Sequence, residues 1–524
     1  MKEGFIDGNW NGKGKTELRD HLRRQPNGDK TWMKLQGRVY GKYMHRAEML
    51  PGVANFLLKC KAQNHNVFII SHKTEYGHFD PEKILLRQEA LKWMEAKRFF
   101  DQEYFGICKE NVFFADTRIE KVNKIALLKC DWFIDDLPEV FTEVKFPSSA
   151  KKILFGKFDR TKFSNDIIPM SNWGDISNYV LGYTTDDDFS IWANLLLNHP
   201  VANIEKVSGR GNSRVYKVQT DEGSNFALKY YPDRLVDVRP RLKTEFHALR
   251  LLHQNNITNV PKAVEKDEDL NIGIYEWIAG EQVSHPKLDD LEQVIHFLEK
   301  LQYLSLEIGE NEIELASEAC LSANELVSQI EIRLLRLKQE SKHFQELSTF
   351  LDATFEPLLA KVKDENIPLW PLESLRNILP QEKQTLSPSD FGFHNVIRRG
   401  DGKIIFIDFD YFGWDDPVKL TADFIWHPGM ELDSDIVAEW ENAMLYLFSD
   451  DPDFADRLKA AMPLYGMRWV LIVLNEFLPG FADRRKEAGI TETYDIFKSR
   501  ETQLDKAKRY CDKVKAMTSQ VTFA

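Results

Sequence analysis

The sequence predicts an α/β unit followed by a two-lobed α+β unit, and three observations lead to this fold class. The 524 residues exceed what one ordinary core holds, so several domains are expected. Apolar strands and helices alternate up to about residue 160, which is typical of a doubly wound parallel sheet. From Val201 onward, glycine-rich alternating segments give way to helical spacing, which indicates a small β-rich lobe and a large helical lobe.

The first part of the chain carries the α/β signal. The short apolar segments "HNVFIIS", "CDWFIDD" and "AKKILF" predict strands, and "DPEKILLRQEALKWMEAKRFF" has helical spacing. The segment "SNDIIPMSNWGDISNYVLGYTTDDDF" then breaks this pattern with Asn, Ser, Gly and an acidic run. We therefore expect an α/β domain at residues 1–165 and a linker at 166–200.

The second part begins as antiparallel strands and continues as helices. The segment "IEKVSGRGNSRVYKVQTDEGSNFALKYY" alternates apolar and polar residues around glycines, which predicts hairpins. The following "RLKTEFHALRLLHQ" places its apolar residues on one helical face. These patterns predict a β-rich lobe at 201–280 and a helical lobe at 281–524.

Composition restricts the class of protein. Hydrophobic residues at 43% and charged residues at 29% are typical of a globular protein, and the net charge of −13 argues against a general nucleic-acid binder. The most apolar helical segment, "MRWVLIVLNEFL", is short and contains charges, so no membrane partner is expected. The five cysteines lack zinc or redox spacing, and the N-terminus lacks an apolar signal segment, which favours a cytoplasmic protein. The histidines show no metal-ligand spacing.

A glycine-containing turn, "SGRGNSRVYKV", is a candidate phosphate-binding loop. Its glycines allow backbone N–H groups to approach phosphates closely, and its polar side chains add donors. The candidate residues are Ser208, Gly209, Gly211, Asn212 and Ser213. An ordinary glycine hairpin is an equally good interpretation of this motif alone.

Two further segments of the β-rich lobe suggest nucleotide contacts. Lys229 lies on the strand after the hairpin, and Glu245 lies on the following helix, where its carboxylate would orient a phosphate-binding lysine. Two solvated charges are the alternative. The apolar run "GIYEWIAGE" suits a connector between lobes whose backbone binds an adenine, with Glu276 and Ile278 as candidates, although a plain strand fits it equally.

The stretch "LSPSDFGFHNVIRRGDGKIIFIDFD" carries the strongest chemical signal. Asp390 is placed to accept or orient the proton of an attacking hydroxyl, and Asn395 follows on the same loop. The strand "KIIFI" then delivers Asp408, so Asn395 and Asp408 are candidate Mg²⁺ ligands. A loop and hairpin with turn-forming Asp and Asn is the alternative. The order of glycine loop, lysine, glutamate and these acidic elements favours phosphoryl transfer.

Residues 201–500 resemble the aminoglycoside phosphotransferase and choline kinase group of protein-kinase-like small-molecule kinases. "SDFGFHNVI" is similar to the catalytic loop of that group, which implies Asp390 as catalytic base and Asn395 as metal ligand. "FIDFDYFGWDDPVKLTADF" is similar to its metal-binding segment. That similarity implies Asp408 on Mg²⁺, Asp410 as a lesser helper, and structural roles for Asp415, Asp416, Pro417 and Asp423. One departure is Pro388, where the group has a histidine that supports the loop.

The N-terminal part resembles the haloacid-dehalogenase fold in "FIISHKTEYGHFD" and "DWFIDDLPEVF". The resemblance implies a phosphate-contacting Ser, a Lys and a metal-binding acidic pair. The matching residues are Ser71, Lys121 or Lys124, and Asp135 with Asp136. A generic acidic pair at a strand end is the alternative for the second segment. The family's nucleophilic Asp-x-Asp strand has no counterpart, because no apolar strand precedes Asp7 and Asn9. We therefore expect a binding or structural module without aspartyl-phosphate chemistry.

Other signals in the helical lobe have plainer interpretations. Its tryptophans could form a cage for a quaternary amine, but core packing is favoured; they are Trp414, Trp426, Trp440 and Trp469. The acidic run "GMELDSDIVAEWE" would attract a cationic acceptor, but a solvated helix start is favoured. Arg468 and Asn475 are candidates for lining an acceptor pocket.

These observations predict a cytoplasmic, ATP- and Mg²⁺-dependent kinase that phosphorylates a hydroxyl of a small molecule. Sugars, amino sugars, amino alcohols and antibiotics all remain candidate acceptors. One alternative is a nucleotide-binding protein without transferase activity. Another is a bifunctional kinase and phosphatase, if an upstream segment supplies the missing nucleophile. The sequence does not choose between ATP and GTP or predict an oligomeric state.

Overall fold

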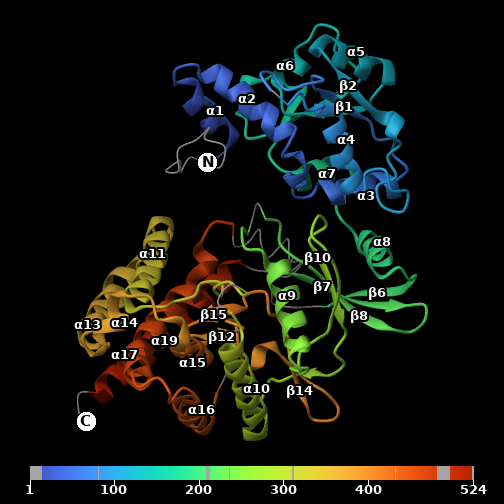
Figure 1. Cartoon of the computed structure of the whole chain (residues 1–524). Coiled ribbons are helices and arrows are strands. Elements are labelled where there is room, and N and C mark those ends of the chain that lie inside the picture. The colour runs from blue at the N-terminus through green and yellow to red at the C-terminus, as the bar shows by residue number, and fades with distance from the viewer. Residues whose placement is uncertain are drawn as a thin grey trace. The chain divides into compact units, whose positions relative to one another are not determined.

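The computed structural model describes residues 14–80, 82–207, 213–234, 237–309, 312–430, 432–480 and 496–521. The chain divides into two compact units, Met1–Leu195 and Leu196–Ala524 (Figure 1). Each unit is described by itself.

The first unit combines helices with short parallel strands. Its elements in chain order are α1 (Lys15–Arg23), α2 (Gly28–Tyr40), α3 (Val53–Ala62), β1 (Ile69–His72), α4 (Leu86–Ala96), β2 (Val112–Ala115), α5 (Arg118–Leu128), β3 (Trp132–Asp135), α6 (Pro138–Phe141), β4 (Lys151–Phe155), β5 (Ile167–Met170), α7 (Trp173–Leu181) and α8 (Asp186–Leu197). Strands separated by helices are thus present, as the sequence predicted.

The strands of the first unit form two small parallel sheets. β1 pairs with β2, and the second sheet has the order β3-β4-β5. One hydrophobic core joins both sheets, because Ile70 of β1 and Phe133 of β3 lie in the same cluster as Val122 and Ile125 of α5. The parallel arrangement agrees with the α/β prediction, whereas the resemblance to the haloacid-dehalogenase fold stays a prediction.

The range 166–200 holds secondary structure, although the sequence suggested a linker. β5 extends the second parallel sheet, and α7 and α8 follow. Two of the polar residues that suggested a junction lie at the ends of α7. The Asn172 side chain accepts a hydrogen bond from the backbone N–H of Asp175, and Gly182 ends α7 at a φ of 85°. The acidic run forms the first turn of α8, where carboxylates stabilise a helix N-terminus.

The second unit begins with a five-stranded antiparallel sheet of order β6-β7-β8-β10-β9. Its strands are β6 (Val201–Val207), β7 (Arg214–Thr220), β8 (Asn225–Tyr230), β9 (Ala263–Asp267) and β10 (Ile272–Glu276). Helix α9 (Arg241–Gln254) lies between β8 and β9 in sequence and packs against β9 and β10, beside the sheet in Figure 1. α9 buries the apolar face that its sequence predicted, including Leu242, Phe246 and Leu249.

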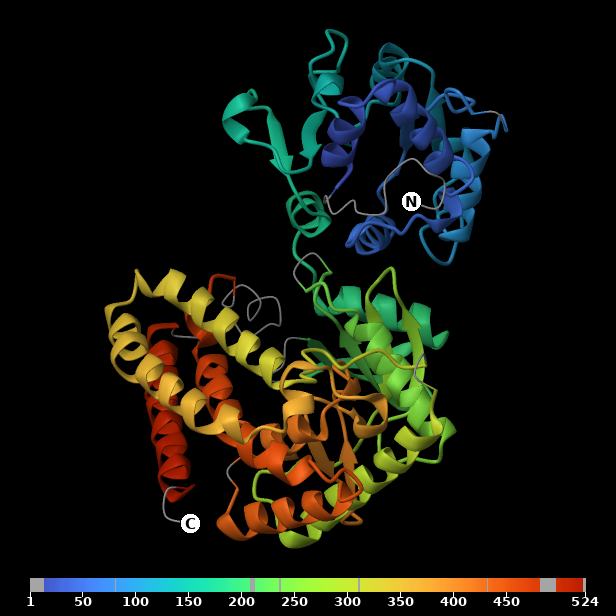
Figure 2. The same ribbon diagram turned by 60° about the vertical axis from the view of Figure 1, so that its left-hand side comes forward.

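The rest of the second unit is mainly helical. Its helices are α10 (Leu288–Glu307), α11 (Ala323–Ser341), α12 (Gln345–Phe350), α13 (Glu356–Asn366), α14 (Leu372–Arg376), α15 (Pro417–Trp426), α16 (Ser434–Leu447), α17 (Phe454–Val473) and α19 (Ile496–Val521). Short strands lie among them: β11 (Glu281–Gln282), β12 (Thr385–Ser387), β13 (Val396–Arg398), β14 (Ile404–Phe406) and β15 (Gly413–Asp415). α17 and α19 run side by side in Figure 2. The second unit therefore has the predicted sheet-rich and helical parts.

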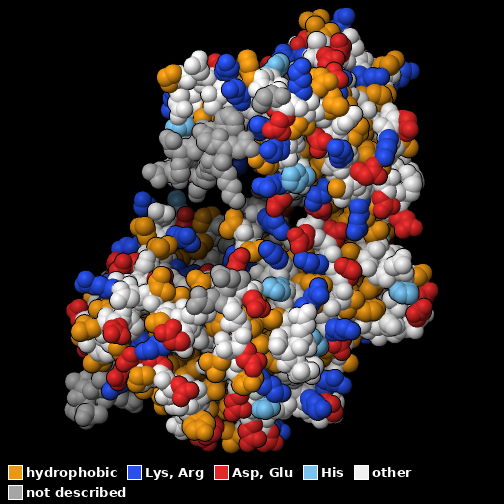
Figure 3. All heavy atoms as spheres, in the orientation of Figure 1, with side chains coloured by type: hydrophobic (Ala, Val, Ile, Leu, Met, Phe, Trp, Pro, Cys, Tyr) orange, Lys and Arg blue, Asp and Glu red, His pale blue; other side chains and the backbone are white. Residues whose placement is uncertain are grey.

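One hydrophobic core connects the sheet and the helices of the second unit, running from Tyr231 to Val514. The four tryptophans considered for an aromatic cage are at most 9% exposed and belong to this core, which confirms the packing interpretation. Among the described helices, none is long and apolar enough to cross a membrane. On the face shown in Figure 3, acidic and basic side chains of the described residues are interspersed.

Candidate active site

The centre of the candidate site is the buried ammonium group of Lys229, at the end of β8. Its Nζ lies 2.6 Å from Oε2 of Glu245 and 2.5 Å from Oδ1 of Asp408, and 4.0 Å from Oδ2 of Asp410. Glu245 reaches Lys229 because α9 packs beside the sheet. Asp408 and Asp410 come from the segment after β14, so this contact links the sheet to the helical part.

Hydrogen bonds fix Glu245 in place. The Tyr231 hydroxyl donates to its Oε2 at 2.6 Å, and the backbone N–H of Phe409 donates to its Oε1 at 3.4 Å. Burial alone would lower the pKa of Lys229, but the carboxylates of Asp408, Glu245 and Asp410 hold that pKa above its ordinary value. Lys229 is therefore a permanent cation at the site.

A second basic residue, Arg241, holds Asp410. Arg241 is the first residue of α9, and its Nη1 lies 2.7 Å from Oδ2 of Asp410. Its Nε donates to Asp237 at 2.7 Å and its Nη2 donates to the Tyr411 hydroxyl at 2.8 Å. Burial and the neighbouring Asp408 raise the pKa of Asp410, while Lys229 and Arg241 oppose that rise. Sequence reasoning did not find Arg241 or Asp237, because nothing local distinguishes them from other charged residues.

Asp390 lies on the loop that follows β12. The preceding residue, Ser389, has a φ of 67°, in the left-handed region, and its Oγ accepts a hydrogen bond from the buried Nζ of Lys419 at 3.0 Å. The backbone N–H of Ser389 donates to the Ser387 hydroxyl at 3.0 Å. These contacts fix the backbone conformation from which the Asp390 side chain projects.

Asn395 and Asp408 lie at the same end of the hairpin formed by β13 and β14. The backbone N–H of Ile407 donates to the carbonyl of Asn395 at 3.0 Å, which places Asp408 one residue beyond this pairing. The Asn395 side chain donates through Nδ2 to the carbonyl of Asp390 at 3.0 Å. Asp408 has a φ of 69°, a strained value for a residue other than glycine. One loop and one hairpin end thus bring Asp390, Asn395 and Asp408 together.

The donor chemistry of this region fits Mg²⁺. Because Nδ2 of Asn395 donates to the Asp390 carbonyl, its Oδ1 is the atom left to face a cation. Carboxylate oxygens of Glu245, Asp408 and Asp410 lie within 4.8 Å of one another. Mg²⁺ prefers such oxygen ligands and completes its shell with phosphate and water. Asn395 and Asp408 are therefore suited to hold the ion.

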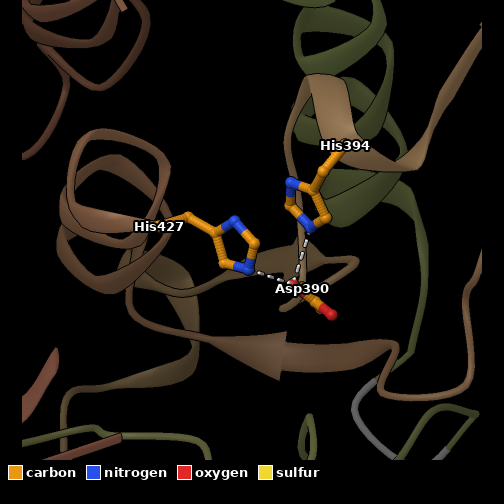
Figure 4. A group of neighbouring side chains, drawn as sticks. All are labelled: Asp390, His394 and His427. Carbon is orange, nitrogen blue, oxygen red and sulfur yellow. Dashed lines mark hydrogen bonds and ion pairs between the residues drawn. The ribbon is translucent and has the colours of Figure 1, made fainter. Parts of the chain in front are cut away.

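Two histidines that sequence reasoning missed contact Asp390. Nε2 of His394 lies 2.9 Å and Nε2 of His427 lies 3.5 Å from Oδ1 of Asp390 (Figure 4). Partial burial would raise the pKa of Asp390, but the His394 hydrogen bond and the charges nearby hold that pKa below its ordinary value. His394 lies within the quoted catalytic-loop motif, whereas no sequence signal marks His427.

The nucleotide-binding candidates are only partly described. Ser208, Gly209, Gly211 and Asn212 lie outside the described residues, and Ser213 immediately precedes β7. In β10, Glu276 exchanges hydrogen bonds with Lys262: its backbone N–H donates to the Lys262 carbonyl at 2.9 Å, and its Oε2 accepts from the Lys262 N–H at 3.2 Å. Ile278 is buried just beyond the sheet.

The acidic residues after Asp408 contact the protein interior. Asp415 accepts from the backbone N–H of Cys320 at 3.0 Å, and Asp416 caps α15 and pairs with buried Arg457 at 2.9 Å. Asp423 pairs with Lys419 at 3.1 Å and with Arg468 at 3.3 Å. Arg468 is 3% exposed, so its charge is directed to Asp423 and Glu318 inside the helical part. Asn475 lies, partly buried, in the short turn after α17.

Of the candidates in the first unit, Lys121 and Asp135 meet in a buried ion pair. Asp135 also accepts from the backbone N–H of Leu137 at 3.0 Å. Lys124 lies over the ring of Phe113 at 4.2 Å, and Asp136 is exposed. Ser71 lies on β1 opposite Phe114 and has no side-chain hydrogen bond among the described residues. The structure thus brings together only the lysine and the first aspartate.

Residues 203–458 match the model of a family described as the phosphotransferase enzyme family. This match agrees with the predicted resemblance for the C-terminal part. The match also supports the prediction of a phosphotransferase. No curated protein sequence matches the chain.

Several solved structures are similar to the second part of the chain. A choline/ethanolamine kinase family protein from Mesorhizobium loti is 15% identical, with a TM-score of 0.36, and the match covers 59% of this chain and 88% of that one. A spectinomycin phosphotransferase in complex with ADP and spectinomycin is 12% identical, with a TM-score of 0.40, covering 60% and 98%. A choline kinase from Cryptosporidium parvum is 12% identical, with a TM-score of 0.40, covering 61% and 91%.

Proposed function

Given a phosphotransferase domain at residues 203–458, we propose that the chain is an ATP- and Mg²⁺-dependent kinase acting on a small-molecule hydroxyl. The observation that carries this proposal is the contact of Lys229 with Asp408 beside the hairpin end that holds Asn395. A cation for phosphate and oxygen ligands for a metal lie together there, next to the loop of Asp390. Phosphoryl transfer requires such positioning and charge neutralisation more than covalent chemistry.

Each residue has a distinct role in this mechanism. Lys229, oriented by Glu245, binds phosphate oxygens of the nucleotide. Asn395 and Asp408 hold Mg²⁺, which supplies charge neutralisation on the triphosphate when it is bound. Asp390 accepts a hydrogen bond from the acceptor hydroxyl and aligns its oxygen with the γ-phosphate. The carboxylate is ionised at neutral pH, so it accepts this hydrogen bond, and its lowered pKa keeps it ionised at more acidic pH as well.

The nucleotide site is proposed to lie beside Lys229, on the central strand β8 of the sheet. The candidate residues Ser208, Gly209, Gly211, Asn212 and Ser213 would contact phosphates. The backbone around Glu276 and Ile278 would contact the adenine. In this proposal residues 201–280 form the nucleotide-binding lobe and 281–524 the acceptor-binding lobe. Cytoplasmic ATP and small hydroxyl compounds would be its ligands, and neither nucleic acid nor membrane is needed as a partner.

The second candidate is a nucleotide-binding protein without phosphotransferase activity. Pro388 supports this candidate, because it stands near the start of the loop in place of the supporting histidine. The same contacts would bind Mg-ATP in both cases. A ligand at about 100 times its Kd adds about 2.7 kcal/mol of stability whether or not transfer follows. Formation of a phosphorylated product therefore distinguishes the candidates, and binding does not.

For residues 1–165 we propose a haloacid-dehalogenase-like binding or structural module. Asp135 ends a parallel strand and pairs with Lys121, as expected for the residues that would contact a phosphate and its metal. Hydrolysis through an aspartyl phosphate requires a nucleophilic carboxylate, and none of these residues supplies it. A bifunctional kinase and phosphatase would require an upstream segment that provides this group.

The test is a screen of sugars, amino sugars, amino alcohols and antibiotics for ATP-dependent phosphate transfer, read by mass spectrometry. The Asp390→Asn variant is expected to lower turnover of a confirmed acceptor roughly 10²–10⁴-fold, because the positioned carboxylate is lost. Undiminished turnover in this variant would remove Asp390 from the mechanism. Absence of product with wild-type protein and every compound, despite Mg-ATP binding, would favour the second candidate.

A further inference from the structure

The two imidazole rings beside Asp390 form a compact pair. The rings of His394 and His427 stack with centroids 3.7 Å apart and planes 14° apart, and both direct Nε2 at Oδ1 of Asp390 (Figure 4). Oδ2 of Asp390 has no partner among the described residues, and the Asp390 side chain is 41% exposed. One oxygen of the carboxylate is thus held by the protein, and the other is left to face a ligand.

The hydrogen bonds around His427 define its tautomer. The backbone N–H of Gly429 lies 3.1 Å from Nδ1 of His427, and a backbone N–H only donates. Nδ1 is therefore the unprotonated nitrogen, and the proton is on Nε2, which faces Asp390. Burial lowers the pKa of His427 to about 4, which keeps this neutral form at neutral pH. An ionised carboxylate only accepts, so Nε2 of His394 is also a donor to Asp390.

The same atoms argue against a metal ion between these three residues, although their ligand atoms lie within 4.8 Å of one another. A histidine that binds a metal through Nε2 carries its proton on Nδ1 and donates it to an acceptor. The backbone N–H of Gly429 points at Nδ1 of His427. The tautomer required for metal binding would therefore place the Nδ1–H group against this N–H group, and two donors cannot bond to each other.

The pair is fixed by close packing on both sides. His427 directly follows α15, and its ring meets the edge of Trp469 at a centroid distance of 5.0 Å. A Cβ atom added at Gly392 would lie 2.4 Å from Sδ of Met430 and 2.9 Å from Nδ1 of His394. A Cβ atom at Gly429 would lie 3.0 Å from Cε1 of His427. Two positions without a side chain thus leave room for the stacked rings and little more.

We propose that His394 and His427 are positioning residues that together hold Oδ1 of Asp390 and so direct Oδ2 to the acceptor hydroxyl. This inference rests on the proposed role of Asp390 in phosphoryl transfer. The histidines act through Asp390 and touch neither nucleotide nor acceptor. Their loss is therefore expected to lower kcat without changing the KM for ATP, because a misplaced catalytic group reduces the rate and not nucleotide binding.

The kinetic experiment uses full-length protein with Mg-ATP and an acceptor confirmed in the screen. His394→Leu and His427→Leu are each expected to lower kcat roughly 10–100-fold, with the KM for ATP within about twofold of wild type. His394→Gln and His427→Gln retain an N–H donor and are expected to recover most of the loss. When Asp390→Asn is already present, adding either leucine substitution is expected to lower kcat by less than about a further threefold. The reason is that the carboxylate positioned by the histidines has already been replaced.

Two outcomes would overturn the inference. One is that the leucine substitutions lower kcat as much in the Asp390→Asn background as in the wild-type protein. The other is that the leucine variants are as active as wild type. A leucine variant that fails to fold is replaced by its glutamine counterpart, for which a large fall in kcat in folded protein would also contradict the inference. The tautomer is tested separately by ¹⁵N NMR of histidine-labelled protein, in which His427 is expected to be protonated on Nε2 alone at pH 7. A failed phosphate-transfer screen with this tautomer intact would reject the proposed function, and protonation on Nδ1 would reject the hydrogen-bonding scheme itself.

Discussion

Lys229 and Asp408 are 179 residues apart in sequence, and Nζ of the first lies 2.5 Å from Oδ1 of the second. Lys229 belongs to the sheet and Asp408 to the segment after β14 in the helical part. The contact therefore joins the proposed phosphate-binding cation to the proposed metal ligand. Glu245 shares the same ammonium group at 2.6 Å, so removing one partner changes the environment of the other two.

Replacing Lys229 by Met is expected to abolish most phosphate transfer and to destabilise the second unit. The change leaves Glu245 buried without its cation, and breaking a buried ion pair from one side costs about 3–5 kcal/mol. The double variant Lys229→Met/Glu245→Gln is expected to be more stable than the single variant, since the unpaired charge is removed. Urea unfolding of the four proteins in this cycle measures the coupling; additive effects within about 0.5 kcal/mol would contradict the pairing.

Removal of Mg²⁺ with a chelator is expected to stop transfer, and Asp408→Asn to raise the Mg²⁺ concentration for half-maximal rate. Loss of a charged oxygen ligand is expected to lower the affinity for Mg²⁺ roughly 10–100-fold. Loss of a residue that only hydrogen-bonds to a metal ligand already has an effect of this size. The measurement is a Mg²⁺ titration of the rate at fixed ATP. Asp401→Asn is the control, because Asp401 is exposed at the opposite end of the same hairpin. Equal Mg²⁺ dependence of both variants would exclude Asp408 as a ligand.

Arg241→Met is expected to destabilise the second unit because it leaves the buried carboxylates of Asp410 and Asp237 without their shared partner. The expected loss is about 3–5 kcal/mol, measured by urea unfolding. Adding Asp410→Asn to this variant is expected to restore part of the loss. Arg250→Met provides a matched control, since Arg250 lies on the exposed side of the same helix. A loss no larger than that of the control would show that the ion pairs contribute little.

The stability of the wild-type protein is expected to fall faster than that of His427→Gln between pH 6.5 and pH 4. Burial lowers the pKa of His427 to about 4, below the ~6.5 of an unfolded histidine. In that interval the unfolded chain binds a proton that the folded chain does not, so the free energy of unfolding decreases by up to about 3 kcal/mol. Urea unfolding at several pH values measures the difference, with His247→Gln on the exposed face of α9 as control. A constant difference from pH 7 to pH 4 would contradict the lowered pKa.

Alkylation of the native protein at pH 8 is expected to modify Cys108 before the other cysteines. Cys108 is exposed, whereas Cys60, Cys320 and Cys511 are buried. Burial raises the pKa of each of these three thiols to about 12, and the thiolate is the reactive form. Peptide mass spectrometry after brief treatment with iodoacetamide identifies the modified sites. Rapid labelling of Cys320 in folded protein would show that its surroundings open to solvent.

Local patterns were sufficient to predict much of the second unit. The contact of Lys229 with Glu245 is predictable from a lysine on a strand and a glutamate on the next helix, because that helix packs against the sheet. Asp390 and Asn395 share one loop, and the following hairpin returns the chain to Asp408. Their spacing alone therefore predicts that they lie near one another. Their roles in catalysis remain predictions.

Other features depend on packing between distant segments and leave no local signal. Arg241 meets Asp410 only because α9 lies beside the segment after β14, and His427 reaches Asp390 only because α15 ends there. The range 166–200 shows the opposite difficulty: its Asn, Gly and Asp residues are as typical of helix ends as of linkers. Composition cannot separate these two uses, whereas hydrogen bonds such as that from Asp175 to Asn172 do.

The long sequence separation between Lys229 and Asp408 also determines when this site forms during synthesis. A ribosome adds about 5–20 residues per second, so Asp408 is added roughly 10–40 s after Lys229. Throughout that interval the nascent chain has the lysine and Glu245 but nothing to complete the ion-pair network. The network of Lys229, Glu245 and Asp408 therefore becomes complete only after the segment that follows β14 has been synthesised.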